Sequence, residues 1–280
     1  MASTNDHAGN VDEVHPIERL RYVARSSGGD QRLLVRETAT AIAGLDLDPA
    51  GLVVACRRLV ERHPSSGPLW WLCANLVTSP DPLREAWGLA NQIDEDPTPG
   101  ELFDNLPDGA TVCIVGWPDL VGDALARRGD IRALVVDSNS EGSSLVRRLQ
   151  RVDVDAEEIS AVGTGAAVEA SDLVVVEAVA AGPDGALCSI GSHAAAAVAY
   201  CSKVPVWLVA GRGRRLPEPM WQAMQKRLSD CDDGWNMPFE RVPLAMITAV
   251  LGPDGLVEPD PSSLAPECPM APELLRISAM

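Results

Sequence analysis

Residues 172–210 read DLVVVEAVAAGPDGALCSIGSHAAAAVAYCSKVPVWLVA, and this stretch decides the fold. The runs 174–176 and 204–209 are short, rich in valine and almost uniformly apolar, which is typical of strands covered by helices on both faces. A polar turn at 183–185 and an alanine-rich helix entered through 190–192 lie between them. The stretch therefore predicts a strand, a turn, a helix and a second strand, which together form the βαβ unit of a parallel sheet.

The helix of this unit begins with two small residues, Gly191 and Ser192. Small residues leave the free N–H groups of the first helical turn accessible, and such groups attract anions. An ordinary capped helix would carry the same residues. The pattern therefore leaves two interpretations open, a structural cap and a phosphate site.

Strands and helices alternate on the N-terminal side of this unit. Strands are expected at 111–115, 133–137 and 158–162, and helices near 118–128, 141–149 and 166–169. Alternation at this spacing indicates a parallel sheet between two layers of helices. Farther upstream, apolar residues recur at three-to-four spacing, which predicts helices at 16–23, 31–45, from 48 onward, 69–76 and 82–93.

These patterns predict an α/β protein in which an N-terminal helical subdomain is followed by a Rossmann-like parallel-sheet domain. The expected division is a disordered tail at 1–14, the helical subdomain at 15–100, the Rossmann-like ligand domain at 101–258 and a C-terminal tail at 259–280.

Ligands of open parallel sheets bind beyond the carboxyl ends of the strands. Polar or flexible residues expected at that edge are Gly116, Asp137, Glu177, Asp184, Arg212 and Arg214. Gly163 and Gly165 also follow an expected strand, but Val168 stands where a dinucleotide fingerprint has its third glycine. The sequence therefore predicts neither a nicotinamide nor any other cofactor.

Composition excludes several classes of function. The net charge of −17 argues against binding to nucleic acid, which requires Lys and Arg to neutralise phosphates. The seven cysteines are scattered through apolar runs without a C-x-x-C pair, which favours packed, reduced thiols over a zinc site. The polar N-terminus and the absence of a long apolar run favour a cytoplasmic protein without a membrane partner.

Several motifs resemble those of a known family. Residues 176–192 correspond to a Val-Gly-Ala-Asp element, an Asn-Gly turn and Asn-Lys-Ile-Gly-Thr, and 204–209 to a Val-Pro-x-x-Val strand. Residues 235–248 are similar to a closing Asn-Pro-x-(Phe/Tyr)-Asp-x-Thr-Pro-x-x-x-Ile-Thr signature, and 62–66 to an Arg-Pro-Thr break. In this order the chain resembles the initiation factor 2B alpha/beta/delta subunit family, which includes the isomerases of methylthioribose-1-phosphate and ribose-1,5-bisphosphate. The resemblance implies a homodimer that binds a phosphorylated ligand.

The departures from the family concern catalysis. The isomerases use a cysteine just after the first sheet strand and the aspartate of Gly-Ala-Asp. Here Cys113 comes two residues early, which displaces it about 7 Å along the strand, and Val179 replaces the aspartate. The resemblance therefore implies that the isomerase pair has been lost.

Three hypotheses remain: a dimeric binder of a phosphorylated sugar or nucleotide, an aldose-ketose isomerase with relocated catalytic groups, and a subunit that contacts translation factors. Cys113 and Glu177 are the candidate catalytic residues, although Cys113 in an apolar strand also fits simple packing. The candidate ligand-binding residues are Gly116, Asp137, Asp184, Gly191, Ser192, His193, Arg212 and Arg214.

Overall fold

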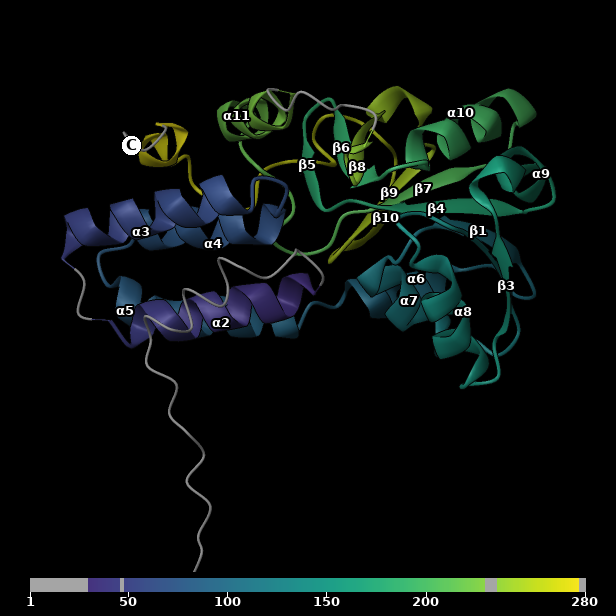
Figure 1. Cartoon of the computed structure of the whole chain (residues 1–280), viewed down its shortest axis with the longest axis horizontal. Helices are drawn as coiled ribbons and strands as arrows, with labels where there is room; N and C mark the ends of the chain where they lie inside the picture. The colour runs from purple at the N-terminus through teal and green to yellow at the C-terminus, as the bar shows by residue number, and fades with distance from the viewer. Residues whose placement is uncertain (1–29, 46–47, 230–235, 277–280) are drawn as a thin grey trace, which may run out of the picture.

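The computed structural model describes residues 30–45, 48–229 and 236–276, and the expected tail at 1–14 and helix at 16–23 lie outside them. A group of helices forms one side of the molecule, and a sheet with its own helices forms the other (Figure 1).

The helical domain contains α2 (Gln31–Ala43), α3 (Pro49–Arg62), α4 (Gly67–Thr78) and α5 (Pro82–Asp94). Each of these helices begins at a polar residue whose side chain accepts a hydrogen bond from an N–H group of the first turn, which stabilises the helix start. These capping residues are Asp30, Asp48, Ser66 and Asp81. The four helices confirm the helical pattern read between 31 and 93.

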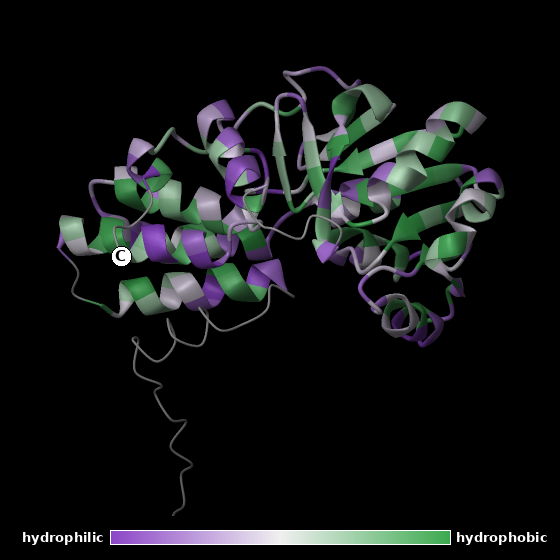
Figure 2. Ribbon diagram, turned by 45° about the horizontal axis from the view of Figure 1, so that its top comes forward, coloured by the Kyte–Doolittle hydropathy of each residue, from purple (hydrophilic) through white to green (hydrophobic). Residues whose placement is uncertain are grey.

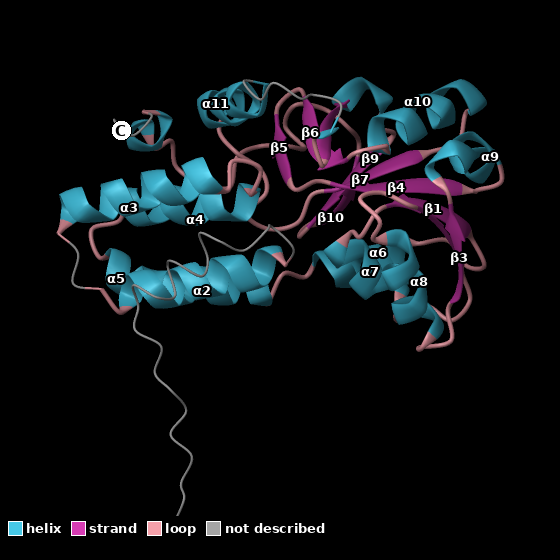
Figure 3. Cartoon of the chain, in the orientation of Figure 1, coloured by secondary structure: helices cyan, strands magenta, loops and turns pink. Residues whose placement is uncertain are grey.

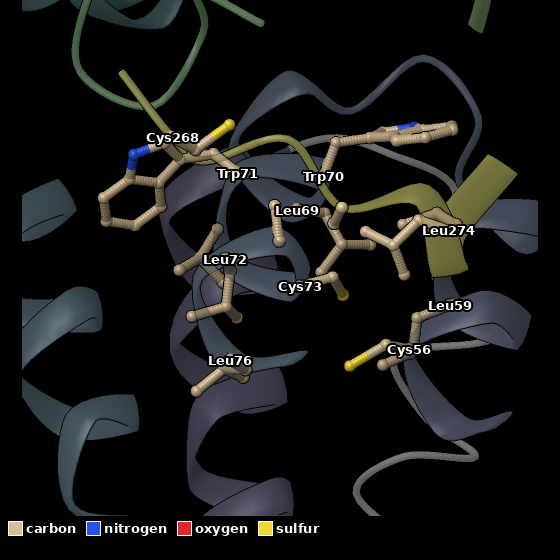
Figure 4. Close-up of a cluster of buried hydrophobic side chains, with 14 of the residues drawn as sticks. Cys56, Leu59, Leu69, Trp70, Trp71, Leu72, Cys73, Leu76, Cys268 and Leu274 are labelled. Carbon is tan, nitrogen blue, oxygen red and sulfur yellow. The ribbon is translucent and has the colours of Figure 1, made fainter. Parts of the chain in front are cut away.

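Helix α4 is the apolar centre of this domain. Trp70, Trp71 and neighbouring leucines of α4 are buried, and Figure 4 shows them beside Leu274 and Cys268 of the C-terminal segment. The indole N–H of Trp71 donates to the Glu267 carbonyl at 3.1 Å. Residues expected to be a C-terminal tail therefore pack into the helical core. Burial of apolar side chains of this size stabilises a fold by about 1.5–3 kcal/mol each.

The second domain is built on a seven-stranded sheet (Figure 3). Its strands, in spatial order, are β10 (Gly255–Val257), β9 (Ala249–Gly252), β7 (Val206–Val209), β4 (Leu173–Glu177), β1 (Thr111–Val115), β2 (Arg132–Val136) and β3 (Asp155–Ile159). All neighbouring strands are parallel except β10, which runs antiparallel to β9. From β1 the chain continues to β2 and β3 on one side of the sheet, and from β4 it continues to β7 and β9 on the other. The carboxyl ends of β1 and β4 therefore form a topological switch point.

Helices cover both faces of the sheet. Helices α6 (Thr98–Asn105), α7 (Asp119–Leu125) and α8 (Gly142–Gln150) cover one face, and α9 (Thr164–Glu169) and α10 (Ser192–Ser202) cover the other (Figure 1). The strands between them are predominantly hydrophobic (Figure 2), because both of their faces are buried. The predicted α/β class, with helices followed by a Rossmann-like sheet, is confirmed.

Two expected elements are corrected. Strand β3 begins three residues earlier than expected. Its first residues are mostly acidic and do not read as a strand, but β3 is an edge strand, where acidic side chains such as Glu157 can remain exposed and pair with Arg132. The expected turn between the two valine-rich strands is the tip of a hairpin. Its strands β5 (Ala180–Gly182) and β6 (Gly185–Ser189) join β8 (Phe239–Pro243) in a second, antiparallel sheet.

Candidate functional site

A cleft of about 830 Å³ lies between the helical domain and the carboxyl ends of the sheet strands. Its helical side is formed by the start of α2 and by residues 62–65 after α3. Its sheet side is formed by residues that follow β1, β2 and β4, so the cleft lies at the switch point. The lining residues that carry charge are Asp30, Arg32, Arg62, Asp119, Asp123, Glu141, Arg148 and Glu177, together with the titratable His63.

The rim of the cleft includes an unusual backbone segment after β2. Asn139 and Ser140 adopt consecutive positive φ angles of 55° and 63°, and the Asn139 amide donates to the Pro238 carbonyl at 3.4 Å. Side chains other than glycine seldom occupy this left-handed region, and such strain clusters at binding sites. The segment therefore supports the assignment of the cleft as a site.

Glu177, the last residue of β4, is held rigidly at the sheet side of the cleft. Its Oε1 accepts from the Arg214 guanidinium at 2.6 Å, and its Oε2 accepts from the Val121 N–H at 2.9 Å. The side chains of Arg214 and Glu177 are only 4% and 7% exposed. Both oxygens of Glu177 are thus engaged within the protein. The predicted position of Glu177 at the strand edge agrees with this geometry.

Asp119 is the most perturbed carboxyl group in the cleft. It is the first residue of α7 and is only partly exposed. Burial and the negative charge of Glu177 raise the pKa of Asp119 to about 7, although Arg214 and Arg32 act against the shift. A carboxyl group with such a pKa holds a proton for about half of the time at neutral pH. Asp119 can therefore donate or accept a hydrogen bond under ordinary conditions.

One helical turn along α7 from Asp119, two arginines share one carboxylate in the cleft. Arg32 of α2 and Arg148 of α8 both donate to Asp123 of α7. Burial alone would raise the pKa of Asp123, but the hydrogen bonds from the two arginines outweigh it and hold this pKa below its ordinary value. Two guanidinium groups share the Asp123 carboxylate, so together they carry more N–H donors than this carboxylate engages.

Cys113 does not reach the cleft. It lies within β1 on the face covered by α9 and α10, has no exposed surface, and burial raises the pKa of its thiol to about 12. A nucleophilic cysteine needs an accessible thiolate. In this geometry Cys113 packs in the core.

The start of α10 is occupied by a side chain of the protein itself. A Glu240 carboxylate oxygen accepts from the N–H groups of Gly191 and His193, at 2.6 and 2.8 Å. Ser192 is buried beside them. An anionic ligand would have to displace Glu240 from these donors. Glu240 therefore acts as a structural cap of this helix.

The arginine loop after β7 does not form an open clamp. Arg214 pairs with Glu177, Arg215 pairs with Glu267 at 2.8 Å, and the Arg212 N–H donates to Asp96. Asp184 lies at the tip of the β5–β6 hairpin, where it accepts from Trp221 and Arg241. None of these residues except Glu177 lines the cleft.

Gly116 and Asp137 support the sheet edge beside the cleft. A Cβ at Gly116, whose φ is 71°, would lie 3.2 Å from the Ser138 Cβ and 3.3 Å from the Ser189 Oγ. The Asp137 carboxylate accepts from the Gly142 N–H at the start of α8. Both residues therefore shape the loops that border the cleft.

Sequence patterns did not single out Asp119, Asp123, Arg32 or Arg148. Asp119 stands three residues after Gly116, which was expected at the ligand edge, so its position carried a usable signal. The other three lie on helices, and only the packing of α2 against α7 and α8 brings them together.

Within the described ranges, no group of three or more His, Cys, Asp or Glu side chains is arranged to hold a metal ion. In that same part of the chain, no helix combines the length and apolar character that a bilayer span requires.

No protein-family model matches the sequence, and no curated protein matches it either. Solved structures do match. The Pyrococcus horikoshii OT3 translation initiation factor eIF-2B has a TM-score of 0.72 at 18% identity, covering 87% of this chain and 97% of that chain. For eIF2B beta from Chaetomium thermophilum the TM-score is 0.67 at 12% identity, with 89% of both chains covered. The tetrameric eIF2B-beta2-delta2 complex from C. thermophilum also gives a TM-score of 0.67, at 14% identity over 86% of this chain and 90% of that chain. The chain therefore has the fold of translation initiation factor eIF-2B subunits, at low sequence identity.

Proposed function

We propose that this protein is a divergent member of the initiation factor 2B subunit family and acts as a cytoplasmic homodimer that binds a phosphorylated sugar or nucleotide in the interdomain cleft. The observation that carries the proposal is the pair formed by Arg32 and Arg148, which share Asp123 in the cleft. Guanidinium groups bind phosphate oxygens through paired hydrogen bonds. We therefore assign the phosphate to these two arginines.

The remaining charges of the cleft restrict what can bind. Carboxylates outnumber arginines in the lining, and the negative charges of Glu177 and Asp30 act on Asp119. A ligand that is anionic throughout would be repelled there. A ligand with one phosphate and an uncharged polyol part matches both the arginine pair and the carboxylates, as a sugar phosphate or the ribose phosphate of a nucleotide does.

The loss of the isomerase pair is part of the proposal. Cys113 is enclosed on the far face of β1, and Val179, which lines the cleft, has no proton to exchange. The resemblance to the isomerases would place the cysteine and the aspartate at the cleft. Neither a cysteine thiol nor an aspartate is therefore available at these two positions of the cleft.

One observation favours the alternative, an aldose-ketose isomerase with relocated groups. Asp119, whose pKa burial and Glu177 raise to about 7, is a suitable general acid or base at neutral pH. Its partner Glu177 is held by Arg214. This alternative requires Asp119 to be the proton carrier.

Native mass spectrometry of the freshly purified protein tests the proposal, because a tightly bound phosphorylated metabolite would be released on denaturation and identified by its mass.

Thermal-shift screening with sugar phosphates and nucleotides should then show stabilisation that Arg148→Ala reduces. Arg147→Ala is the matched control, since Arg147 is exposed on the same helix, does not line the cleft, and its guanidinium donates to Ser144. Equal stabilisation in both variants would refute the phosphate site.

A further inference from the structure

Two neighbouring carboxyl groups at the sheet side of the cleft differ in what they can still bind. Glu177 uses both oxygens, one on Arg214 and one on the Val121 N–H. For Asp119, the described residues provide no hydrogen bond to its carboxyl group, although it lines the same cleft. Among the described residues, none uses the hydrogen-bonding capacity of the Asp119 carboxyl group, which can therefore serve another molecule.

We propose that Asp119 determines the specificity of the cleft by donating a hydrogen bond to an uncharged oxygen of the ligand, a hydroxyl or a carbonyl, while the phosphate lies at Arg32 and Arg148. This inference rests on the proposed function and adds to it the chemistry of the ligand's uncharged end. It assigns a role to a residue that neither the family motifs nor the sequence pattern indicated.

The surroundings of Asp119 explain why it acts as a donor. Burial and Glu177 raise its pKa to about 7, so a proton is available near neutral pH. An ionised Asp119 has no proton to donate to a ligand oxygen, and beside Glu177 its negative charge would repel the ligand's phosphate. The charged and titratable groups that face Asp119 from the elements around it are Asp30 and Arg32 on α2, Arg62 and His63 after α3, Asp123 on α7, Glu141 and Arg148 at α8, Glu177 on β4 and Arg214.

Proton loss then sets how binding depends on pH. With a pKa of about 7, the protonated fraction falls from roughly nine-tenths at pH 6 to one-tenth at pH 8. If only the protonated form binds the sugar oxygen, the dissociation constant rises about tenfold over this interval.

Isothermal titration calorimetry with ribose 5-phosphate and inorganic phosphate, at pH 6 and pH 8, tests the inference. The probes are titrated into the parent, Asp119→Asn and Asp119→Ala. From pH 6 to pH 8, we expect the affinity of the parent for ribose 5-phosphate to fall about tenfold more than its affinity for inorganic phosphate. Inorganic phosphate is the reference because the ionisation of its own phosphate also changes over this interval. The asparagine amide donates at both pH values, so Asp119→Asn should bind ribose 5-phosphate with no such excess loss. Asp119→Ala should bind it weakly at both.

The outcomes separate this inference from the proposed function. If both probes bind the parent but the excess loss persists in Asp119→Asn, the role of Asp119 is wrong and the phosphate site stands. If neither probe binds the parent, the phosphate site is refuted, and the ligand role of Asp119 falls with it. A carbon-13 NMR titration of the ligand-free parent gives an independent readout, because an Asp119 carboxyl that titrates near pH 4 would overturn the inference whether or not the variants fold.

Discussion

The Arg214 guanidinium lies 2.6 Å from the Glu177 carboxylate, and both side chains are almost completely enclosed at the sheet side of the cleft. Arg214 also donates to the carbonyl of Ala178, the residue after Glu177. The pair therefore links the loop after β7 to the end of β4. It fixes the sheet edge that borders the cleft and withholds Arg214 from an incoming anion.

Arg214→Ala should destabilise the protein strongly. The substitution leaves Glu177 buried without its counter-ion, and breaking a buried pair in this way costs about 3–5 kcal/mol. Arg241→Ala is the control, because the ion pair of Arg241 with Asp184 is solvent-exposed, with side chains 41% and 57% accessible, and such pairs contribute about 0–1 kcal/mol. Urea unfolding followed by circular dichroism measures both. Similar losses in the two variants would contradict the assigned role of the buried pair.

Asp119 should make stability depend on pH. Its folded pKa of about 7 lies above the ordinary value of 3.8, so between these values the folded state binds more protons than the unfolded state. Stability from this group is therefore present below about pH 4 and falls as the pH rises toward 7. Asp119→Asn removes the titration, so in thermal melts the stability of the variant should rise relative to the parent from about pH 4 to pH 7. A difference between variant and parent that stays constant across this range would exclude a raised pKa.

Glu240 should be a structural cap of α10 that can be replaced by an external anion. Glu240→Ala leaves the N–H groups of Gly191 and His193 without their acceptor, which costs about 1–2 kcal/mol. Added sulfate should then stabilise Glu240→Ala more than the parent, because the free helix start attracts anions. Glu218→Ala, an exposed change on α11 (Glu218–Ser229), serves as the control. If sulfate stabilises all three proteins equally, no anion site is uncovered at α10.

The sequence predicted the elements that depend on local pattern. The valine-rich runs at β4 and β7 identified the sheet, and the position of Glu177 at the end of β4 placed it at the ligand edge. The hairpin at 180–189 was missed because its strands are short and built of small residues that resemble a turn.

The partners of the site residues could not be predicted in the same way. Glu240 lies 49 residues from Gly191, and Arg32 lies 91 residues from Asp123. Local periodicity carries no information on pairings at such separations, which arise only when the whole chain folds. Burial also depends on how the whole chain packs. The exclusion of Cys113 from the cleft and the raised pKa of Asp119 could therefore be recognised only from the structure.

The chain should form a homodimer in solution, largely through the sheet domain. The segment 239–251 contributes Val242, Val250 and Leu251 to the core, while Leu244 and Met246 remain partly accessible. Tyr200 on α10 is 67% exposed and adds apolar surface to that domain. Size-exclusion chromatography with light scattering at micromolar concentration should give twice the 29.7 kDa of the chain. A stable monomer would refute the dimer.

Methylthioribose-1-phosphate and ribose-1,5-bisphosphate should not be isomerised at a useful rate. Proton transfer between adjacent sugar carbons needs an acid and a base within about 3 Å of the reacting atoms. Cys113 is enclosed with a thiol pKa of about 12, and both Glu177 oxygens are engaged. An NMR assay should therefore show no turnover above about 1 per second. Faster turnover that Asp119→Asn abolishes and Cys113→Ser leaves unchanged would instead establish catalysis by relocated groups. Asp119, a cleft carboxyl that exchanges its proton near neutral pH, would then replace the lost cysteine and aspartate of the isomerases.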